Sequence, residues 1–511
     1  MDFYCMNPDT TNKNMSSRML RTNNFDTSLI KQFLHIRFNT PAGTYVACGH
    51  KFSVDAIAMT VDLDNTHTIY LDMWSLNHRP SITFTPIQGE VYTLVAYDAG
   101  YLSLGGIWVN IKTADTSSGT EIYPYNGPVN PLYEKHNSFV FALFKQKNGD
   151  ITDIAAQKSQ VLKTVVDNDG IYYLDSFISS NNLEGPVGIG FIAVAADAFG
   201  IQYFIDRNIF NNCPYLVSSN KGLQTALRSM GYQLDGNNSF TDYRGTFLLG
   251  LQVDLQVTYY SPEAHFDSCC THSMQSMVEV RVDPLATTTL MPLHVRNQPF
   301  IQLLPIEMRM PTPVTGQLYT LLLLDVTEAK ANISNPNTVI HWQVVNIPGD
   351  DIPSGDTIRG YLSPLPAIKK DVRTMMFLLL SQPSRVDPGA LWSYTGTGCD
   401  SRTTLRCKFN LGAFMKNLNF KLVGLTMFLT EQDAFTRAVL YGSVNLNDIA
   451  TSDTTNTISL ISMDTACNGV SGYANPCPDA CSSTNPGVTN PVAGTTVTPT
   501  TTTMMMHDHG M

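Results

Sequence analysis

The feature that most limits how this chain can fold is an internal repeat. Residues 92–98 (YTLVAYD) recur as residues 319–325 (YTLLLLD), at an offset of 227 positions. Beyond them the offset becomes 236 and holds for about ninety residues, which is hard to obtain by chance. The pairs at this second offset are Val109-Asn110-Ile111 with Val345-Asn346-Ile347, Phe141 with Phe377, Gln146 with Gln382, and Asp197-Ala198-Phe199 with Asp433-Ala434-Phe435. The repeat predicts two copies of one domain.

The length of 511 residues agrees with two copies, because domains typically contain about 100–200 residues. The change of offset places an insertion of nine residues in the second copy, around Thr327–Asn337, where we expect a surface loop. The predicted parts are an N-terminal arm, a first domain, a junction, a second domain and a tail, at residues 1–23, 24–220, 221–242, 243–452 and 453–511.

Strand signals dominate both copies. Short apolar runs rich in Tyr, Phe, Val and Leu are bounded by Gly, Pro, Asn or Asp, which is typical of buried strands. These runs are residues 92–97, 139–144, 318–324 and 375–380, whereas helical periodicity is best at 153–166 and 409–417. We therefore predict a mainly antiparallel β protein with few helices.

The composition excludes several classes of protein. Hydrophobic residues make up 43% of the chain and charged residues only 15%, so it is not a disordered polyelectrolyte. There are 32 basic against 43 acidic residues, a net charge of −11, which disfavours nucleic acid as a partner. The apolar runs are far shorter than the ~20 residues that span a bilayer, so we expect no transmembrane segment.

The signals for cellular location conflict. The first 24 residues lack the apolar stretch of a signal peptide, which favours the cytosol unless such a peptide has been removed. The cysteines favour an oxidising compartment instead, because their number is even and several are closely spaced near the C-terminus. The disulfide candidates are Cys48, Cys213, Cys269, Cys270, Cys399, Cys407, Cys467, Cys477 and Cys481, with Cys5 as the tenth cysteine.

Possible glycosylation also favours an extracellular location. N-glycosylation sequons begin at Asn14, Asn237 and Asn332. No lysine or arginine follows Arg437, and residues 484–503 contain nine threonines, a composition that resembles an O-glycosylated stalk or a plain flexible tail. We predict an extracellular protein with a low-complexity, Thr/Pro-rich C-terminal tail.

Several segments resemble the phosphatidylethanolamine-binding protein (PEBP) family, which includes the Raf kinase inhibitor proteins and many secreted invertebrate antigens. The most specific segment is HWQVVNIPG at residues 341–349. Supporting segments are NHRPSI at 77–82, FVFALFKQ at 139–146, LQVTY at 255–259, YTLLLLD at 319–325 and MFLLLSQ at 376–382. The resemblance implies two tandem, degenerate β-sandwich domains of Greek-key topology, each with a small anion pocket at one end.

Carried over residue by residue, the family pocket is altered in the second copy. Its aspartate falls on Asp325 and its first histidine on His341, while the second histidine position holds Arg373, which could also face an anion. In the first copy Asp98 remains, but the histidine positions hold Gly105 and Asn137. The resemblance thus implies a ligand site in the second copy alone. The alternative is that these residues cap a turn or fill the core.

Other short motifs lack part of the pattern that they resemble. GIGFIA at residues 188–193 matches a dinucleotide-binding pattern, but it follows Gly185-Pro186 rather than an uninterrupted strand. Cys48-Gly49-His50 and Cys270-Thr271-His272 lack a third catalytic partner, so we interpret Cys48 and Cys269 or Cys270 as structural disulfide partners. The Met- and His-rich end, residues 504–511, suits copper but is more often inert. We expect no cofactor, metal site or enzymatic activity.

Two functional hypotheses remain. The first is an extracellular, glycosylated structural or interaction protein that associates with itself, because edge strands of such domains can pair with a neighbouring chain. The alternative is a secreted protein that binds a phospholipid headgroup or another small anion through Asp325, His341 and Arg373. Inhibition of a protease or kinase, as the family resemblance also allows, is the third.

Overall fold

A computed structural model describes the chain from residue 27 to residue 440. Within this range the description leaves out residues 62–69, 129, 131–136, 169, 233–238, 242–246, 269–270, 284, 286–288, 307–315, 332–336, 367–371 and 398–402. The hairpin of β16 (Ala264–Ser268) and β17 (Thr271–Gln275) belongs to a unit separate from the main one. The remaining elements form the other unit.

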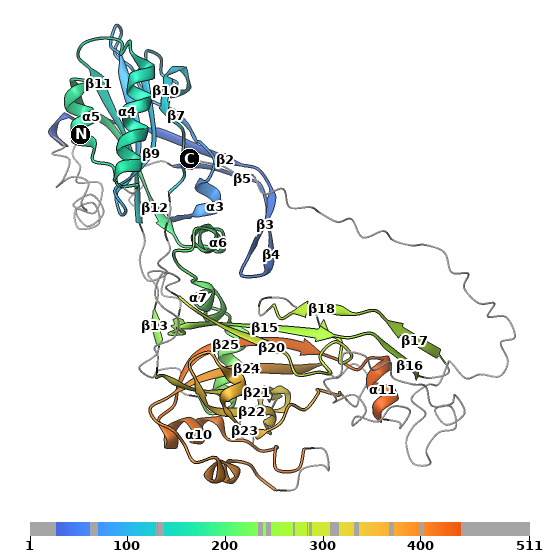
Figure 1. Ribbon diagram of the computed structural model, residues 1–511. Coiled ribbons are helices and arrows are strands. Elements are labelled where there is room, and N and C mark those ends of the chain that lie inside the picture. Colours follow the sequence, from blue (N-terminus) through green and yellow to red (C-terminus); the bar gives the residue numbers. More distant parts are fainter. Residues whose placement is uncertain are drawn as a thin grey trace, which may run out of the picture. The chain divides into compact units, whose positions relative to one another are not determined.

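Two large β-sheets dominate the main unit (Figure 1). The strands of the first run in the order β1 (Gln32–Phe33), β12 (Leu183–Ala195), β11 (Asn137–Gln146), β8 (Tyr92–Asp98), β9 (Ser103–Ile111) and β10 (Thr120–Tyr123), with β6 (Tyr70–Asp72) also paired to β12. Those of the second run in the order β19 (Thr289–Leu290), β25 (Lys421–Thr430), β24 (Arg373–Gln382), β21 (Leu318–Asp325), β22 (Val339–Pro348) and β23 (Asp356–Arg359).

Apart from β6, the strands of the two large sheets correspond one to one in their order. In each, the first pair in the order is parallel and the other four pairs are antiparallel. The predicted strands at 92–97, 139–144, 318–324 and 375–380 are the central strands β8, β11, β21 and β24. These strands are buried along nearly their whole length, which explains why their sequences are continuous apolar runs rather than alternating ones.

A small three-stranded sheet accompanies each large one. The first comprises β5 (Ile57–Val61), β2 (His35–Thr40) and β7 (Ser81–Thr83), and the second β18 (Val278–Arg281), β15 (Val253–Ser261) and β20 (Phe300–Pro305). The central strand of each alternates between buried and more exposed residues. Its buried side chains share a core with the large sheet, as Ile36 does with Phe141 and Val257 with Phe377. The chain is thus mainly β, with several sheets.

The helices lie mostly where the chain leaves or enters a sheet. The two predicted helices are present as α4 (Ile154–Asp167) and α10 (Leu411–Leu418), capped by the side chains of Asp153 and Asn410. The other helices of the main unit are α3 (Met73–Leu76), α5 (Leu174–Ser180), α6 (Ala198–Asp206), α7 (Cys213–Ser218), α8 (Lys221–Ser229) and α9 (Thr327–Ala331). In the described part of the chain the last helix is α11 (Ala434–Leu440), and short strands β13 (Ser239–Thr241) and β14 (Phe247–Leu249) form a hairpin.

Helix α8 lies in the segment that the sequence presents as a junction. Its polar and apolar residues segregate, and Leu223 and Leu227 are buried in a core cluster with Leu322 and Leu378 of the second sheet. Helix α7 contributes Val217 to the same cluster. Residues from 213 onward therefore pack with the second sheet, ahead of the expected start of the second domain.

A buried hydrogen-bond network fixes the far end of the first sheet. Asn110 has a φ of 59°, a left-handed conformation that asparagine tolerates better than most residues. Its N–H donates to Oε1 of Gln146 (2.8 Å), which also accepts from the Thr93 hydroxyl (2.9 Å). The Asn110 amide in turn exchanges hydrogen bonds with the backbone N–H and C=O of Ile151 (2.8 and 2.9 Å). The network joins the three strands β8, β9 and β11 and the loop that follows β11.

The second sheet contains the same network. Asn346 has a φ of 56°, and its N–H donates to Oε1 of Gln382 (2.7 Å). That oxygen also accepts from the Thr320 hydroxyl (2.7 Å), and the Asn346 amide bonds both backbone groups of Val386 (2.8 and 2.9 Å). The Asn and Gln residues are those that the repeat aligns at an offset of 236, so the alignment has a physical basis.

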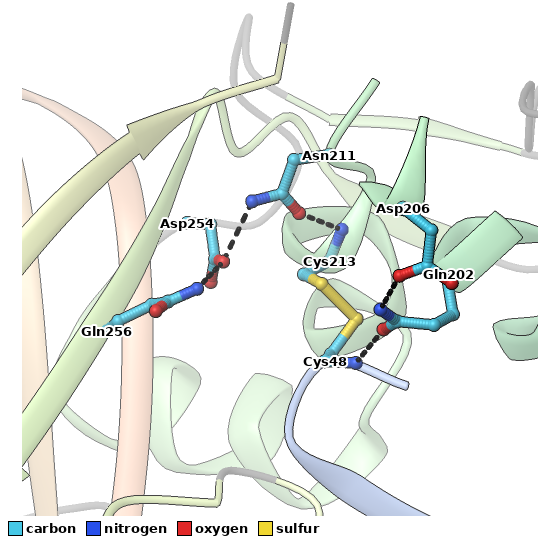
Figure 2. The surroundings of a disulfide bond; sticks show 7 residues. All are labelled: Cys48, Gln202, Asp206, Asn211, Cys213, Asp254 and Gln256. Carbon is cyan, nitrogen blue, oxygen red and sulfur yellow. Dashed lines mark hydrogen bonds between the residues drawn. A yellow bond between two sulfur atoms is a disulfide. The ribbon is translucent and has the colours of Figure 1, made fainter. Parts of the chain in front are cut away.

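A disulfide joins Cys48 to Cys213, with 5.6 Å between their Cα atoms (Figure 2). Cys48 and Gly49 form the two-residue turn between β3 (Gly43–Ala47) and β4 (His50–Val54), and both have positive φ, as in a type I′ turn. Cys213 begins α7, and Asn211 beside it accepts from the Cys213 N–H and donates to Asp254.

This pairing corrects the expectation that Cys48 bonds to Cys269 or Cys270. Helix α7 begins at Cys213 and brings it within the distance that a disulfide with Cys48 spans. Cys407 is also disulfide-bonded. Cys5, Cys269, Cys270, Cys399, Cys467, Cys477 and Cys481 lie outside the described residues.

Replacing Gln382 with leucine should lower the free energy of unfolding by about 3 kcal/mol, because the Thr320 hydroxyl and the Asn346 N–H would lose a buried partner. The matched control is Gln302→Leu, since Gln302 is exposed on β20, and its effect should stay within about 0.5 kcal/mol. Urea denaturation of both variants measures the difference. Equal effects would contradict a structural role for the network.

Candidate functional site

Antiparallel pairing brings the three predicted site residues to one end of the second sheet. Asp325 is the last residue of β21, Arg373 the first of β24 and His341 the third of β22. The register places Asp325 opposite Met375 on one side and Val339 on the other. All three residues therefore lie near the same strand ends.

Arg373 forms an ion pair with Asp325, whose Oδ2 lies 3.3 Å from Nη1 of the guanidinium. A second carboxylate, that of Glu328 in α9, lies 3.7 Å from the same nitrogen. Asp325 is only 8% exposed and also accepts a hydrogen bond from the Thr327 N–H (3.0 Å). The charge of Arg373 is thus balanced by two carboxylates of the protein itself, which weakens its attraction for an external anion.

His341 is the extra residue of a β-bulge. Leu323 pairs with Trp342 and Leu324 with Ile340, so the register passes over His341. Its Nδ1 lies 2.8 Å from the Leu362 carbonyl oxygen, and because a carbonyl only accepts, Nδ1 carries a proton. The ring is 7% exposed, so His341 is largely a buried residue.

At the corresponding end of the first sheet, an aromatic ring fills the space beside the bulge. Gly105 is the extra residue of the equivalent bulge, between the pairs Ala96–Gly106 and Tyr97–Leu104. A Cβ at Gly105 would lie 2.5 Å from the ring of Phe139, so an aromatic side chain fills the place of a side chain at this position. Asp98, at the position of Asp325, accepts a hydrogen bond from the Asn137 amide.

One structural feature beside the predicted site, the position of Arg406, belongs to no motif in the sequence. Arg406 donates from Nη1 to the carbonyls of Ile340 (3.2 Å) and His341 (3.1 Å), and from Nη2 to that of Gly360 (3.0 Å). It thus holds the bulge of His341 against the segment after β23. A single arginine in an irregular segment carries no periodic or spacing signal, so its position could not be inferred from the sequence.

The other sequence motifs lie either within a strand or outside the described residues. GIGFIA at residues 188–193 lies wholly inside strand β12, where no helix begins. The sequon residues Asn14, Asn237 and Asn332 and the Met- and His-rich end lie outside the described residues. Among the residues that are described, none of the helices is long and apolar enough to cross a membrane, and no group of three potential metal ligands gathers.

Comparisons with known proteins give weak similarities. No family model matches the chain. A 26 kDa secreted antigen from Toxocara canis is 28% identical over 99 residues, which are 19% of this chain and 38% of the antigen. The chain therefore spans about two fifths of the length of that relative.

Solved structures of PEBP family members are also similar to part of the chain. A carboxypeptidase Y inhibitor, solved in complex with its cognate proteinase, is 18% identical and matches over 36% of this chain and 85% of the inhibitor, with a TM-score of 0.25. PEBPs from Plasmodium vivax and Plasmodium falciparum are 18% and 15% identical, over 36% and 41% of this chain and 87% and 96% of theirs, with TM-scores of 0.23 and 0.25.

Gly105→Ala should destabilise the protein by about 1–3 kcal/mol, because the new methyl group would overlap the Phe139 ring. Phe139→Leu in the same chain should recover part of that loss, although Phe139→Leu alone is destabilising. A double-mutant cycle by chemical denaturation gives the coupling between the two positions. A coupling of zero would show that Phe139 does not close this end of the sheet.

Proposed function

We propose that this chain is an extracellular, non-enzymatic interaction protein that associates with itself. In this proposal two tandem, degenerate PEBP-like β-sandwich domains, near residues 24–220 and 243–452, act as building blocks. The observation that carries it is the state of the two sheet ends, one filled by Phe139 against Gly105 and the other occupied by the Asp325–Arg373–Glu328 ion pairs. Among the described residues, neither end presents a set of acid, base and nucleophile.

The duplicated topology and the Asn–Gln networks support a tandem arrangement, since both recur at the offsets of the repeat. An extracellular location is supported by the Cys48–Cys213 disulfide and by the name of the Toxocara relative, a secreted antigen. Glycans at Asn14, Asn237 and Asn332 and on the Thr-rich tail are part of the proposal.

Self-association would use edge strands. In the small sheet β18-β15-β20, the outer strands pair on one side only among the described strands. Phe300 on β20 is 58% exposed, and the exposed residues of β18 alternate with half-buried ones. An edge strand with an exposed aromatic side chain offers both backbone hydrogen bonds and apolar contact to a second chain.

A second candidate is a protein that binds a phospholipid headgroup or another small anion at Asp325, His341 and Arg373. It is favoured by the placement of the three residues at one sheet end. An anion there would have to compete with Asp325 and Glu328 for Arg373. Native mass spectrometry after gentle purification should then reveal a bound mass that His341→Ala removes, and an empty wild-type protein would contradict this candidate.

Phe300→Lys should reduce self-association, because a charged side chain on the edge strand opposes pairing. Ile87→Lys is the matched control, since Ile87 is equally exposed, at 58%, but lies outside the strands. Light scattering coupled to size exclusion should show a mass above the monomer for the wild type and the control at micromolar concentration. A wild-type protein that is strictly monomeric would end the assembly proposal.

The secreted protein should lose mass on treatment with N- and O-glycosidases, because the proposal places sugars on the sequons and on the tail. Intact-mass spectrometry before and after each enzyme measures this loss. Asn332→Gln should remove one N-glycan and leave the O-linked mass unchanged. A mass equal to that of the bare chain before treatment would contradict both glycosylation and the extracellular assignment.

A further inference from the structure

Two arginines of the second sheet region lie next to each other without a carboxylate. Arg359, the last residue of β23, is 2% exposed. Its Nε donates to the Leu405 carbonyl (2.9 Å), Nη2 to the Thr395 hydroxyl (3.2 Å) and Nη1 to Oε1 of Gln343. Like the three carbonyls bound by Arg406, all of these acceptors are neutral. Among the described residues, neither guanidinium has an acidic group within ion-pair distance.

Other arginines of the same region have acidic partners. Arg373 pairs with Asp325, and Nη2 of Arg385 lies 2.8 Å from Asp356. Arg296 shows that neutral oxygens alone can hold one buried guanidinium, since it donates to the Leu293 and Pro262 carbonyls and the Ser261 hydroxyl. The Arg359–Arg406 cluster differs from it because two like charges are brought together.

This arrangement disfavours the charged form of both arginines, so both pKa values are lowered. Burial and, to a smaller extent, the positive charge of Arg406 lower the pKa of Arg359 to about 10. Burial also lowers the pKa of Arg406. Removing two like charges from water without a counter-charge is unfavourable, and an anion held between them and the solvent would offset that cost.

The cluster contains donors that no described residue uses. The hydrogen bonds of Arg406 use Nη1 and Nη2, so its Nε–H has no acceptor among the described residues. Nε2 of Gln343, beside Arg359, is buried and has no partner among the described residues. Arg406 is reachable from solvent, since it is half-buried and its neighbours Gly360 and Leu405 are exposed. Unused donors beside two cations call for an acceptor that is negatively charged.

We propose that Arg406 binds a small oxyanion, a carboxylate or a phosphate, with the buried charge of Arg359 behind it. The planar guanidinium suits both groups, because each offers oxygens that accept charge-assisted hydrogen bonds from its N–H groups. Trp392 stacks on Arg359, with the guanidinium carbon 4.5 Å from the ring centroid, and is 44% exposed, so it lies beside the site as a natural fluorophore. The site differs from Asp325, His341 and Arg373, and it does not depend on self-association.

The test is isothermal titration of the full chain with sodium phosphate and, separately, with sodium acetate, at an ionic strength held constant with sodium chloride. At least one of the two anions should bind the wild type and change its tryptophan emission. Binding of phosphate alone identifies a phosphate group as the ligand chemistry, and binding of acetate alone identifies a carboxylate. Trp392→Phe should remove the change in emission and leave the heat of binding.

Arg406→Met should weaken binding by about tenfold or more, since charge-assisted hydrogen bonds would be lost. Arg406→Lys keeps a charge without the fork of donors and should also weaken binding, which covers the case in which Arg406→Met fails to fold. The matched control is Arg385→Met, an exposed arginine of the same region, which should change the affinity less than twofold.

Three results would overturn the proposal: no binding of either anion to the wild type, an equal loss in Arg385→Met, or a loss in Arg373→Met with none in Arg406→Lys. The last result would assign the anion to the end of the sheet that contains Asp325. Because the titration reports binding and not assembly, a monomeric protein could still support this inference, and a self-associating one could still refute it.

Discussion

The structure depends on an asparagine whose backbone adopts a left-handed conformation within each large sheet. At Asn110 and Asn346 the backbone φ is positive, and the side chain bonds the loop that follows the strand two places away in the sheet. A glutamine completes each network by accepting from the asparagine N–H and from a threonine hydroxyl. Because an unsatisfied buried polar atom is costly, a change at one of the three positions is expected to destabilise the whole network.

The opposite ends of the two sheets differ although the sheet topology is shared. Both have a bulge at the same place, with Gly105 in one and His341 in the other. Phe139 occupies the space beside Gly105, whereas the corresponding position of the second sheet holds Met375. Both also have an aspartate, but Asp98 bonds an amide and Asp325 a guanidinium. The two sheets therefore share a backbone arrangement at these strand ends and differ in the side chains placed on it.

Much of the fold could be predicted from the sequence, because apolar runs and a constant offset report burial and topology directly. Strands β8, β11, β21 and β24 and helix α4 follow this rule. Helices α7 and α8 do not, since their apolar residues are complementary to the second sheet, and a local pattern cannot say which core a helix joins. The bond between Cys48 and Cys213 is missed for a related reason: it links positions that the repeat does not relate. The proposed role of Arg359 and Arg406 depends on the neutral groups that surround them in the fold. The spacing of residues in the sequence does not predict those surroundings.

The disulfide has a consequence for how the two halves depend on each other. Cys48 lies in a hairpin of the first half, while Cys213 begins a helix whose neighbours are β14, β15 and β25 of the second half. The disulfide therefore links the two halves through cysteines that are 165 residues apart along the chain. A fragment that ended at residue 220 would retain both sulfur atoms but deprive α7 of the surface on which it rests. Although the two halves share one sheet topology, the disulfide and the packing of α7 tie the first half to the second.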